Sequence, residues 1–372
     1  MGFGAFGLFW GAWGAILPAV RTESGVNDGE LGLALLMIGL GALASMRFTG
    51  YLIDRYGGFV LPVAVGLFGL SGVLPALADS AVTLSVALFL LGATSGATDV
   101  AINATGSHTE AVTGRPLMNL AHGYFSIAVV AASLSTAGLR AAGVDALPVL
   151  GGVGVLIVAL AVLVLAPGSR QRGFASSGPG AKRRPEPVLL VFGGVCALAY
   201  LVENAWQSWS AVHLDTSLDA PPGLASIAPA VFAAAAATGR IAGNALLERF
   251  RPVHLLVFGG ALAAVGSLSA AAAGNVWLAL AGIAAAGLGT SVCAPTIIGM
   301  TGAWAGPERR AGAISTVTTI AYLGFLLGPA AVGAASSAWS LPVALGGVAV
   351  LAVVVAFLAP VAGRIGERQK AV

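Results

Sequence analysis

Apolar runs of about 20 residues follow one another along the whole chain, and this pattern restricts the fold more than any other feature. A helix rises about 1.5 Å per residue, so each run is long enough to cross roughly 30 Å of hydrocarbon. Only 9% of the 372 residues are charged, whereas a soluble domain has about a quarter. A soluble core this apolar would leave no polar surface to face water, so the solvent must be largely lipid.

The runs are separated by polar turns, and they predict twelve membrane-spanning helices. The predicted spans lie at 2–20, 31–52, 59–78, 81–105, 117–139, 147–167, 188–213, 223–247, 253–273, 275–301, 311–335 and 339–362. One connection, 168–187, is long, basic and rich in Gly, Ser and Pro, and it follows the sixth span. We therefore predict an all-α membrane protein with a six-helix bundle at 1–167, a linker at 168–187 and a second six-helix bundle at 188–372.

The basic residues predict the orientation of the spans. When alternate loops are assigned to the side of the linker, only Arg21 and Arg140 of the 18 Lys and Arg residues fall on the opposite side. Cytoplasmic loops are enriched in Lys and Arg. We therefore expect a cytoplasmic linker and two cytoplasmic termini. This bias also accounts for the net charge of +3 without a nucleic-acid partner.

The two halves resemble each other at a nearly constant offset. The aligned pairs are 49–56 with 243–250 (250 − 56 = 194), Trp13 with Trp206 (206 − 13 = 193) and Gly92 with Gly287 (287 − 92 = 195). These correspondences indicate a duplicated six-helix unit. Two such halves place a site at their interface near the bilayer midplane, and rocking of the halves exposes the site to each side in turn. The duplication therefore favours a secondary transporter.

Asp99 is the most informative residue, because it lies midway along the fourth predicted span. An ionisable group inside a membrane span is costly and indicates a functional site. Asn103 follows four residues later, on the same helical face. A carboxyl that is charged when ionised and neutral when protonated is what proton coupling requires. The alternative is a buried aspartate that only holds neighbouring helices together.

The seventh predicted span carries a second polar cluster. Glu203 and Gln207 are four residues apart, and Tyr200 and Trp206 flank them. Acid, amide and aromatic groups together suit a polar organic ligand, because hydrogen bonds orient it and aromatic faces cover its apolar edges. Anchoring at the membrane interface is the alternative for Trp206. By the repeat offset, Trp10 occupies the position equivalent to Glu203.

The turn after the second span carries a family signature. Gly50, Asp54, Arg55 and Gly57 match the G-x-L-x-D-R-x-G pattern of the major facilitator superfamily, which the chain resembles over its whole length. A second copy in the other half comprises Arg240, Glu248 and Arg249. The resemblance implies that both copies form a cytoplasmic gate. It also implies that spans one, four, seven and ten line the cavity, which adds Trp10 and Trp13 to the predicted site.

A narrower resemblance rests on the segment from Asp99 to Asn103, with Glu110, Arg115, Met118, His122, Gly123 and Ser126 further on. These residues resemble a bacterial group of uncharacterised permeases that is similar to fucose–proton symporters. In those symporters a carboxylate of span four, with Asn four residues later, belongs to the substrate and proton site. Their acid in span one is missing between Gly2 and Val20, and we infer that Glu203 replaces it.

The sequence therefore predicts proton-coupled uptake of a small polar organic solute, with a sugar-like molecule as the narrower class, by a monomer in the inner membrane of a prokaryote. Export of a small molecule or metabolite is the alternative, although the G-P-x-x-G-G signature of drug exporters is absent from 117–139. No predicted span contains a metal set or a nucleophile–base dyad, so we expect neither an enzyme nor a cofactor. The lipid bilayer and the solute are the expected partners.

Overall fold

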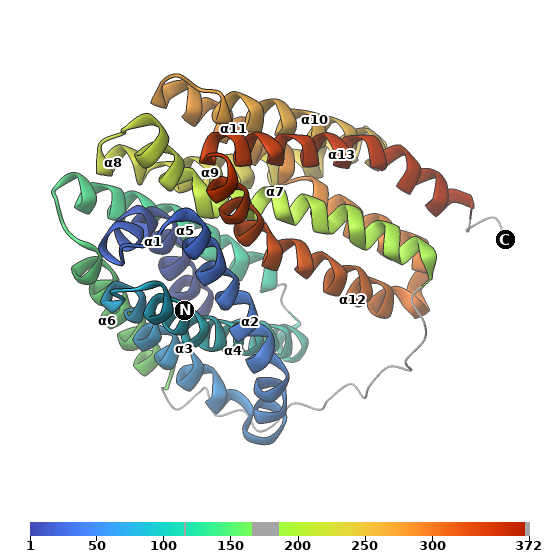
Figure 1. Cartoon of the computed structure of the whole chain (residues 1–372). Helices are drawn as coiled ribbons and strands as arrows, with labels where there is room; N and C mark the ends of the chain where they lie inside the picture. Colours follow the sequence, from blue (N-terminus) through green and yellow to red (C-terminus); the bar gives the residue numbers. More distant parts are fainter. Residues whose placement is uncertain (115–116, 166–185, 369–372) are drawn as a thin grey trace. The chain divides into compact units, whose positions relative to one another are not determined.

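The computed structural model describes residues 1–114, 117–165 and 186–368, and these form helices throughout (Figure 1). The elements are α1 (Gly2–Glu23), α2 (Asp28–Tyr56), η1 (Gly57–Phe59), α3 (Val60–Ser71), η2 (Leu74–Leu77), α4 (Ala81–Thr113), α5 (Met118–Ala141), α6 (Ala146–Val164), α7 (Pro187–Leu218), α8 (Pro222–Ala225), α9 (Ala228–Leu247), α10 (Pro252–Ala271), α11 (Val276–Thr290), α12 (Cys293–Ala338) and α13 (Leu341–Arg368). Nearly all of the predicted linker at 168–187 lies outside the described residues, and α7 begins at its end.

Eleven stretches of the described residues are long and apolar enough to cross a membrane. One of them, Asp28–Leu77, contains two of the twelve predicted spans. The predicted third span is divided, since α3 ends at Ser71 and a separate 3-10 turn with Pro75 in it begins at Leu74. Two other predicted spans are joined in α12, which breaks only where Gly306 adopts a φ of 71°. The expected all-α membrane architecture is confirmed, and the span count agrees approximately with the expectation of twelve.

Local signals determine where several helices begin and end. Asn27 caps α2 by accepting a hydrogen bond from the backbone N–H of Glu30, whose carboxylate in turn accepts from the N–H of Asn27. Ser80 and Thr83 form the same reciprocal arrangement at the start of α4. These capping boxes satisfy N–H groups that have no partner within the helix. Gly57, one of the predicted gate residues, ends α2 at a φ of 63°, a conformation that favours glycine.

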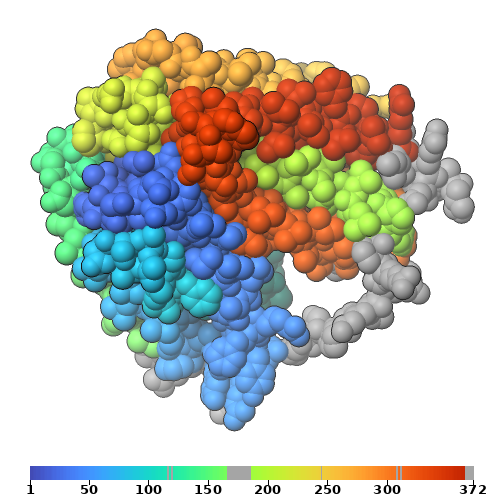
Figure 2. Space-filling model, viewed as in Figure 1, coloured from blue at the N-terminus to red at the C-terminus, as the bar shows by residue number. Residues whose placement is uncertain are grey.

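The helices divide into two compact units, each with its own packing. Unit 1 comprises Met1–Gly178 with Pro221–Ala230, and unit 2 comprises Pro179–Ala220 with Val231–Val372. In unit 1, α1 packs on α5, α2 on α4, and α3 on α6. In unit 2, α7 packs on α12, and α10 packs on α11 and α13 (Figure 1). The space-filling view shows α7 and α12 in continuous contact (Figure 2).

Close helix contacts recur at equivalent places in the two units. A methyl group at Gly92 of α4 would overlap the backbone carbonyl of Ile38 in α2. A methyl group at Gly287 of α11 would lie 2.8 Å from the backbone oxygen of Phe232 in α9. The contacted residues are 194 positions apart (232 − 38) and the glycines 195 (287 − 92), so the sequence repeat corresponds to a repeated contact. Small residues at these crossings let membrane helices approach closely.

The connection between α7 and α9 packs within unit 1, although it follows α7 in the chain. The Ser226 hydroxyl donates a hydrogen bond of 2.7 Å to the backbone oxygen of Ala15 in α1, in a buried position. A methyl group at Gly223 would lie 2.5 Å from the Cβ of Ala141 at the end of α5. Because Pro221–Ala230 has its contacts in unit 1, the boundary between the units does not follow the linker alone.

Gly92→Val tests the close contact between α2 and α4. The clash is with backbone rather than with a flexible side chain, so the two helices must separate, at a cost of about 1–3 kcal/mol. We expect a lower thermal unfolding midpoint in detergent, measured by size-exclusion chromatography after heating. Gly152→Val is the control, because a methyl group there meets no atom within 4 Å. Equal midpoints for the two variants would contradict this account of the packing.

Candidate functional site

Asp99 and Asn103 contact each other on α4, as their spacing predicts. The Asn103 side-chain amide donates to the Asp99 carboxylate at 3.0 Å and to the Asp99 backbone oxygen at 2.9 Å. Both residues are half-buried. The ring of His122, on α5, is an electrostatic neighbour of the Asp99 carboxyl and stands edge-on to Phe3, with ring centroids 4.8 Å apart. Unit 1 therefore holds a membrane carboxyl that accepts a hydrogen bond from a neutral amide.

Trp10 and Trp13 belong to an aromatic cluster on α1. The Trp13 ring is buried and lies parallel to Phe9, with centroids 6.2 Å apart. Trp10 is half-buried and stands edge-on to Phe6 and Phe9, at 6.1 and 5.5 Å between centroids. Of the two predicted tryptophans, Trp10 is therefore the one with exposed ring surface.

Glu203 forms an ion pair inside unit 2. The Arg240 guanidinium, on α9, donates from Nη2 to Oε1 of Glu203 at 2.7 Å. The Gln207 amide donates to the same oxygen at 3.2 Å, as the spacing of four residues on α7 predicts. The Glu203 side chain is 10% exposed and that of Arg240 is 45% exposed. The structure thus joins Glu203 and Gln207 to a residue that the sequence assigned to the gate motif.

Tyr200 lies one helical turn before Glu203 on α7. It is half-buried, and the electrostatic neighbours of its hydroxyl are Cys196, Glu203 and Arg240. Cys196 and Cys293 are both buried, free thiols. Among the described residues, no group of three or more His, Cys, Asp or Glu side chains is arranged to hold a metal ion.

Trp206 does not join this cluster. Its ring is fully buried, and its indole N–H donates to the Ser267 hydroxyl of α10 at 2.8 Å. Trp209 is also fully buried and donates to the backbone oxygen of Pro329 at 3.1 Å, so neither residue anchors the protein at the membrane interface. Asn204, between them, donates to the backbone oxygen of Phe325 in α12. These three side chains hold α7 against its neighbours.

Apart from Arg240, the charged residues of the gate motif lie at helix ends. Asp54 and Arg55 are exposed at the end of α2, where the Arg55 guanidinium donates to the Tyr51 hydroxyl at 3.0 Å. A methyl group at Gly50 would meet no atom within 4 Å, so packing does not require glycine there. Glu248 and Arg249 are exposed just beyond the end of α9.

The pairing of Glu203 with Arg240 was missed from the sequence, although a signal for it exists. Arg240 is the only Lys or Arg residue within the predicted spans of the second half. A charged group within a span usually has a partner of opposite charge. Glu203 is the acid in the middle of the preceding span, so the two residues could have been paired on charge alone.

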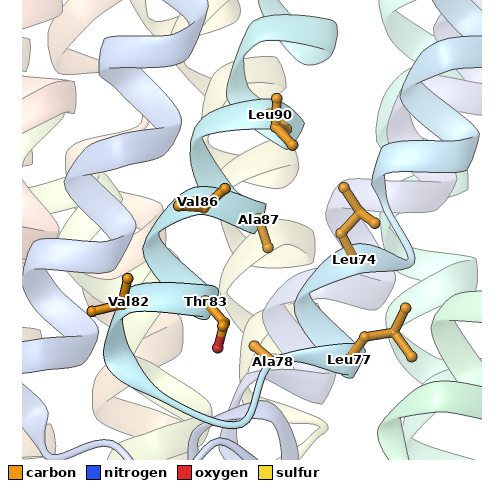
Figure 3. A pocket seen from close by; sticks show the side chains of 8 residues that line it. All are labelled: Leu74, Leu77, Ala78, Val82, Thr83, Val86, Ala87 and Leu90. Carbon is orange, nitrogen blue, oxygen red and sulfur yellow. The ribbon is translucent and has the colours of Figure 1, made fainter.

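A separate groove lies where η2 meets α4. It has a volume of about 300 Å³ and is lined by Leu74, Leu77, Ala78, Val82, Thr83, Val86, Ala87 and Leu90 (Figure 3). The Thr83 hydroxyl already bonds to Asp79 and Ser80. Because the rest of the lining is apolar, the groove suits hydrocarbon rather than a polar solute, and it is not part of the candidate site.

Known proteins show the same sequence pattern and fold. The family model described as Major Facilitator Superfamily matches residues 191–371. An uncharacterised MFS-type transporter of Yersinia pestis is 31% identical over 351 residues, covering 94% of this chain and 91% of that protein. The chain therefore belongs to the major facilitator superfamily. It is a multi-pass membrane protein with the architecture of a secondary transporter.

Solved structures agree with this assignment of the fold. A variant of the nucleoside transporter NupG superposes with a TM-score of 0.82 at 14% identity, covering 97% of each chain. A bacterial homologue of the human lysosomal transporter Spinster, in an inward-facing and occupied conformation, gives a TM-score of 0.77 at 17% identity and covers 98% of this chain and 95% of its own. At these identities the similarity establishes the fold alone.

A double-mutant cycle on Glu203→Gln and Arg240→Gln tests the buried ion pair. Removing one partner leaves a charge in a poorly solvated place, so we expect a coupling of about 1–3 kcal/mol in the free energy of unfolding. The exposed pair of Arg309 and Glu186, also 2.7 Å apart, is the control and should couple by less than about 1 kcal/mol. Urea unfolding followed by tryptophan fluorescence measures both. Similar couplings would mean that burial does not strengthen the Glu203 pair.

Proposed function

We propose that this protein is a proton-coupled secondary active transporter that carries a small polar organic solute by alternating access. The observation that carries the proposal is the half-buried Asp99 carboxyl within a membrane span, held by Asn103 and without an ion pair among the described residues. Ionisable groups inside membrane spans mark solute and ion pathways. A carboxyl held by a neutral amide can exist in either protonation state without breaking an ion pair.

The two carboxyls of the spans have different surroundings, which suits different tasks. Asp99 is held by an amide, with the His122 ring as an electrostatic neighbour, so protonation removes its charge without breaking a salt bridge among the described residues. Glu203 is held by a guanidinium, so its charge is compensated inside unit 2. We assign the proton to Asp99 in the first instance. Within unit 2, the polar groups of Gln207 and Tyr200 are assigned to the solute, and Glu203 belongs to the same site as the partner of Arg240.

The remaining assignments follow from the charge pattern and the signature motif. We place the protein in the inner membrane of a prokaryote as a monomer, with both termini and the linker in the cytoplasm. Asp54 and Arg55, with Glu248 and Arg249, are assigned to the cytoplasmic gate. Their exposed positions at the ends of α2 and α9 support this role, since a gate must exchange partners as it opens.

Proton-driven export is the second candidate. The same Asp99 would then release its proton as the solute binds, and the solute would leave against the proton flow. The segment from Gly328 to Gly333, with Pro329, resembles part of the exporter signature but lies in α12 rather than in the fifth span. The direction of proton movement relative to the solute distinguishes uptake from export.

A ligand-library thermal-shift screen at pH 5.5 and pH 8 tests the role of Asp99. We expect a solute that stabilises the wild type to different extents at the two pH values, because protonation of Asp99 changes the charge of the site. Asp99→Asn should reduce this pH dependence. Asp145→Asn should retain it, because that carboxyl is 80% exposed and outside the site.

Proteoliposomes that contain the purified protein then test coupling. A pH gradient should drive the stabilising solute across the membrane in the wild type and in Asp145→Asn but not in Asp99→Asn. A pH-sensitive dye inside the vesicles reports whether protons move with the solute or against it. Solute movement that ignores the pH gradient in the wild type would reject proton coupling.

A further inference from the structure

The ion pair of Glu203 and Arg240 lies in two membrane-spanning helices, where charged groups lose solvation free energy. Both residues lie in helices that are apolar and long enough to span the bilayer, Pro187–Leu218 and Pro222–Leu247. Two charges removed from water lose solvation that their attraction only partly returns, and well-packed apolar side chains often stabilise a protein as well or better. The pair therefore calls for a role other than stability.

Its two members are unequally exposed. The Glu203 side chain is 10% exposed, whereas 45% of Arg240 is accessible. Glu203 is contacted through Nη2 of the guanidinium, and an arginine carries five N–H donors in a planar fork. No hydrogen bond of Nε or Nη1 is found among the described residues, and a guanidinium binds a carboxylate through two parallel hydrogen bonds from such a pair of donors.

We infer that the solute carries a carboxylate, which binds Arg240 in exchange for Glu203. This inference rests on the proposed function and names the class of its solute. Polar groups for the remainder of the molecule stand beside the arginine. The Gln207 amide is exposed on the same face of α7, and the Tyr200 hydroxyl lies one turn away. The class that fits is a small hydroxylated carboxylic acid.

The exchange conserves the charge of the site. Before binding, Arg240 carries one positive and Glu203 one negative charge. When the solute carboxylate takes the guanidinium, Glu203 accepts one proton from the surrounding water and becomes neutral, while Gln207 remains its neighbour. The sum is zero in both states, so no uncompensated charge is left in the membrane.

The groups that face Glu203 limit what else can titrate there. In the described part of the chain these are Arg240 from α9, Tyr200 and Cys196 on α7, and Cys293 from α12. Arginine stays protonated at all relevant pH values. No second carboxyl is among them, so the proton that accompanies the exchange is assigned to Glu203. Lower pH should therefore favour binding of the acid.

Matched pairs of solutes test the inference on the purified full-length protein. The probes are lactate with lactamide, glycerate with glyceramide, and gluconate with gluconamide, titrated to 10 mM in a thermal-shift assay at pH 5.5 and pH 8. We expect at least one acid to stabilise the protein at about tenfold lower concentration than its amide, and more strongly at pH 5.5. Equal effects of acid and amide, or no stabilisation by any acid, would overturn the carboxylate assignment.

Variants then separate the two partners. Arg240→Gln should weaken binding of the acid about 10- to 100-fold, because a charge-assisted hydrogen bond is lost. Arg240→Lys should recover part of that loss, because lysine keeps the charge but not the fork. Glu203→Gln removes the competitor, so it should bind the acid more tightly than the wild type at pH 8, with a smaller gain at pH 5.5. Weaker binding to Glu203→Gln at both pH values would show that Glu203 contacts the solute and would overturn the exchange.

Uptake into proteoliposomes distinguishes this inference from the proposed function. If the amide and its acid are transported equally well, and both move with protons, the carboxylate class is overturned but proton-coupled transport is not. If acid binding depends on Arg240 but transport does not respond to a pH gradient, the carboxylate site is supported and proton coupling is rejected. The exposed arginine variant Arg309→Gln is the control and should match the wild type in every assay.

Discussion

Lipid cannot hydrogen-bond to the backbone or to side chains, and this constraint governs the whole structure. Helices satisfy the backbone within each span. The polar side chains that cross between helices of one unit then bond mainly to each other or to backbone oxygens. Asn204 and Trp209 bond to carbonyls of α12, and Trp206 bonds to Ser267 of α10. Because these bonds join α7 to its neighbours, the same groups that must be satisfied also fix the packing of unit 2.

The duplicated halves keep their contacts but not their charges. Gly92 and Gly287 make equivalent crossings, so backbone approach is shared by the two units. The positions of Glu203 and Arg240 correspond to Trp10 and Arg47 at an offset of 193 (203 − 10 and 240 − 47). An acid and a base therefore meet in unit 2, whereas an indole occupies the position of the acid in unit 1. The two units can differ in these polar residues and still pack alike, because close helix contact depends on the small residues and the candidate site depends on the polar ones.

Two membrane carboxyls thus reach stability by different means. The Asp99 carboxylate accepts from a neutral amide and can lose its charge without breaking a salt bridge among the described residues. The Glu203 carboxylate is compensated by Arg240, so loss of its charge would leave the guanidinium without its partner. This difference follows from the hydrogen-bond partners, Asn103 for Asp99 and Arg240 for Glu203, and not from how deeply the two carboxyls are buried. On this difference we base the proposals that Asp99 carries the proton and that Glu203 responds to an anionic solute.

The sequence by itself determined the membrane helices, their order and the repeat, because hydropathy, span length and caps are local properties. It also placed Asp99 beside Asn103 and Glu203 beside Gln207, since a spacing of four residues needs only a helix. Only the tertiary structure decided that Glu203 meets Arg240, 37 residues away, and that Trp206 is committed to Ser267, 61 residues away. Such contacts depend on how helices rotate and pack against each other. A single helix carries no record of that, because each polar residue could face either lipid, a neighbour or a cavity.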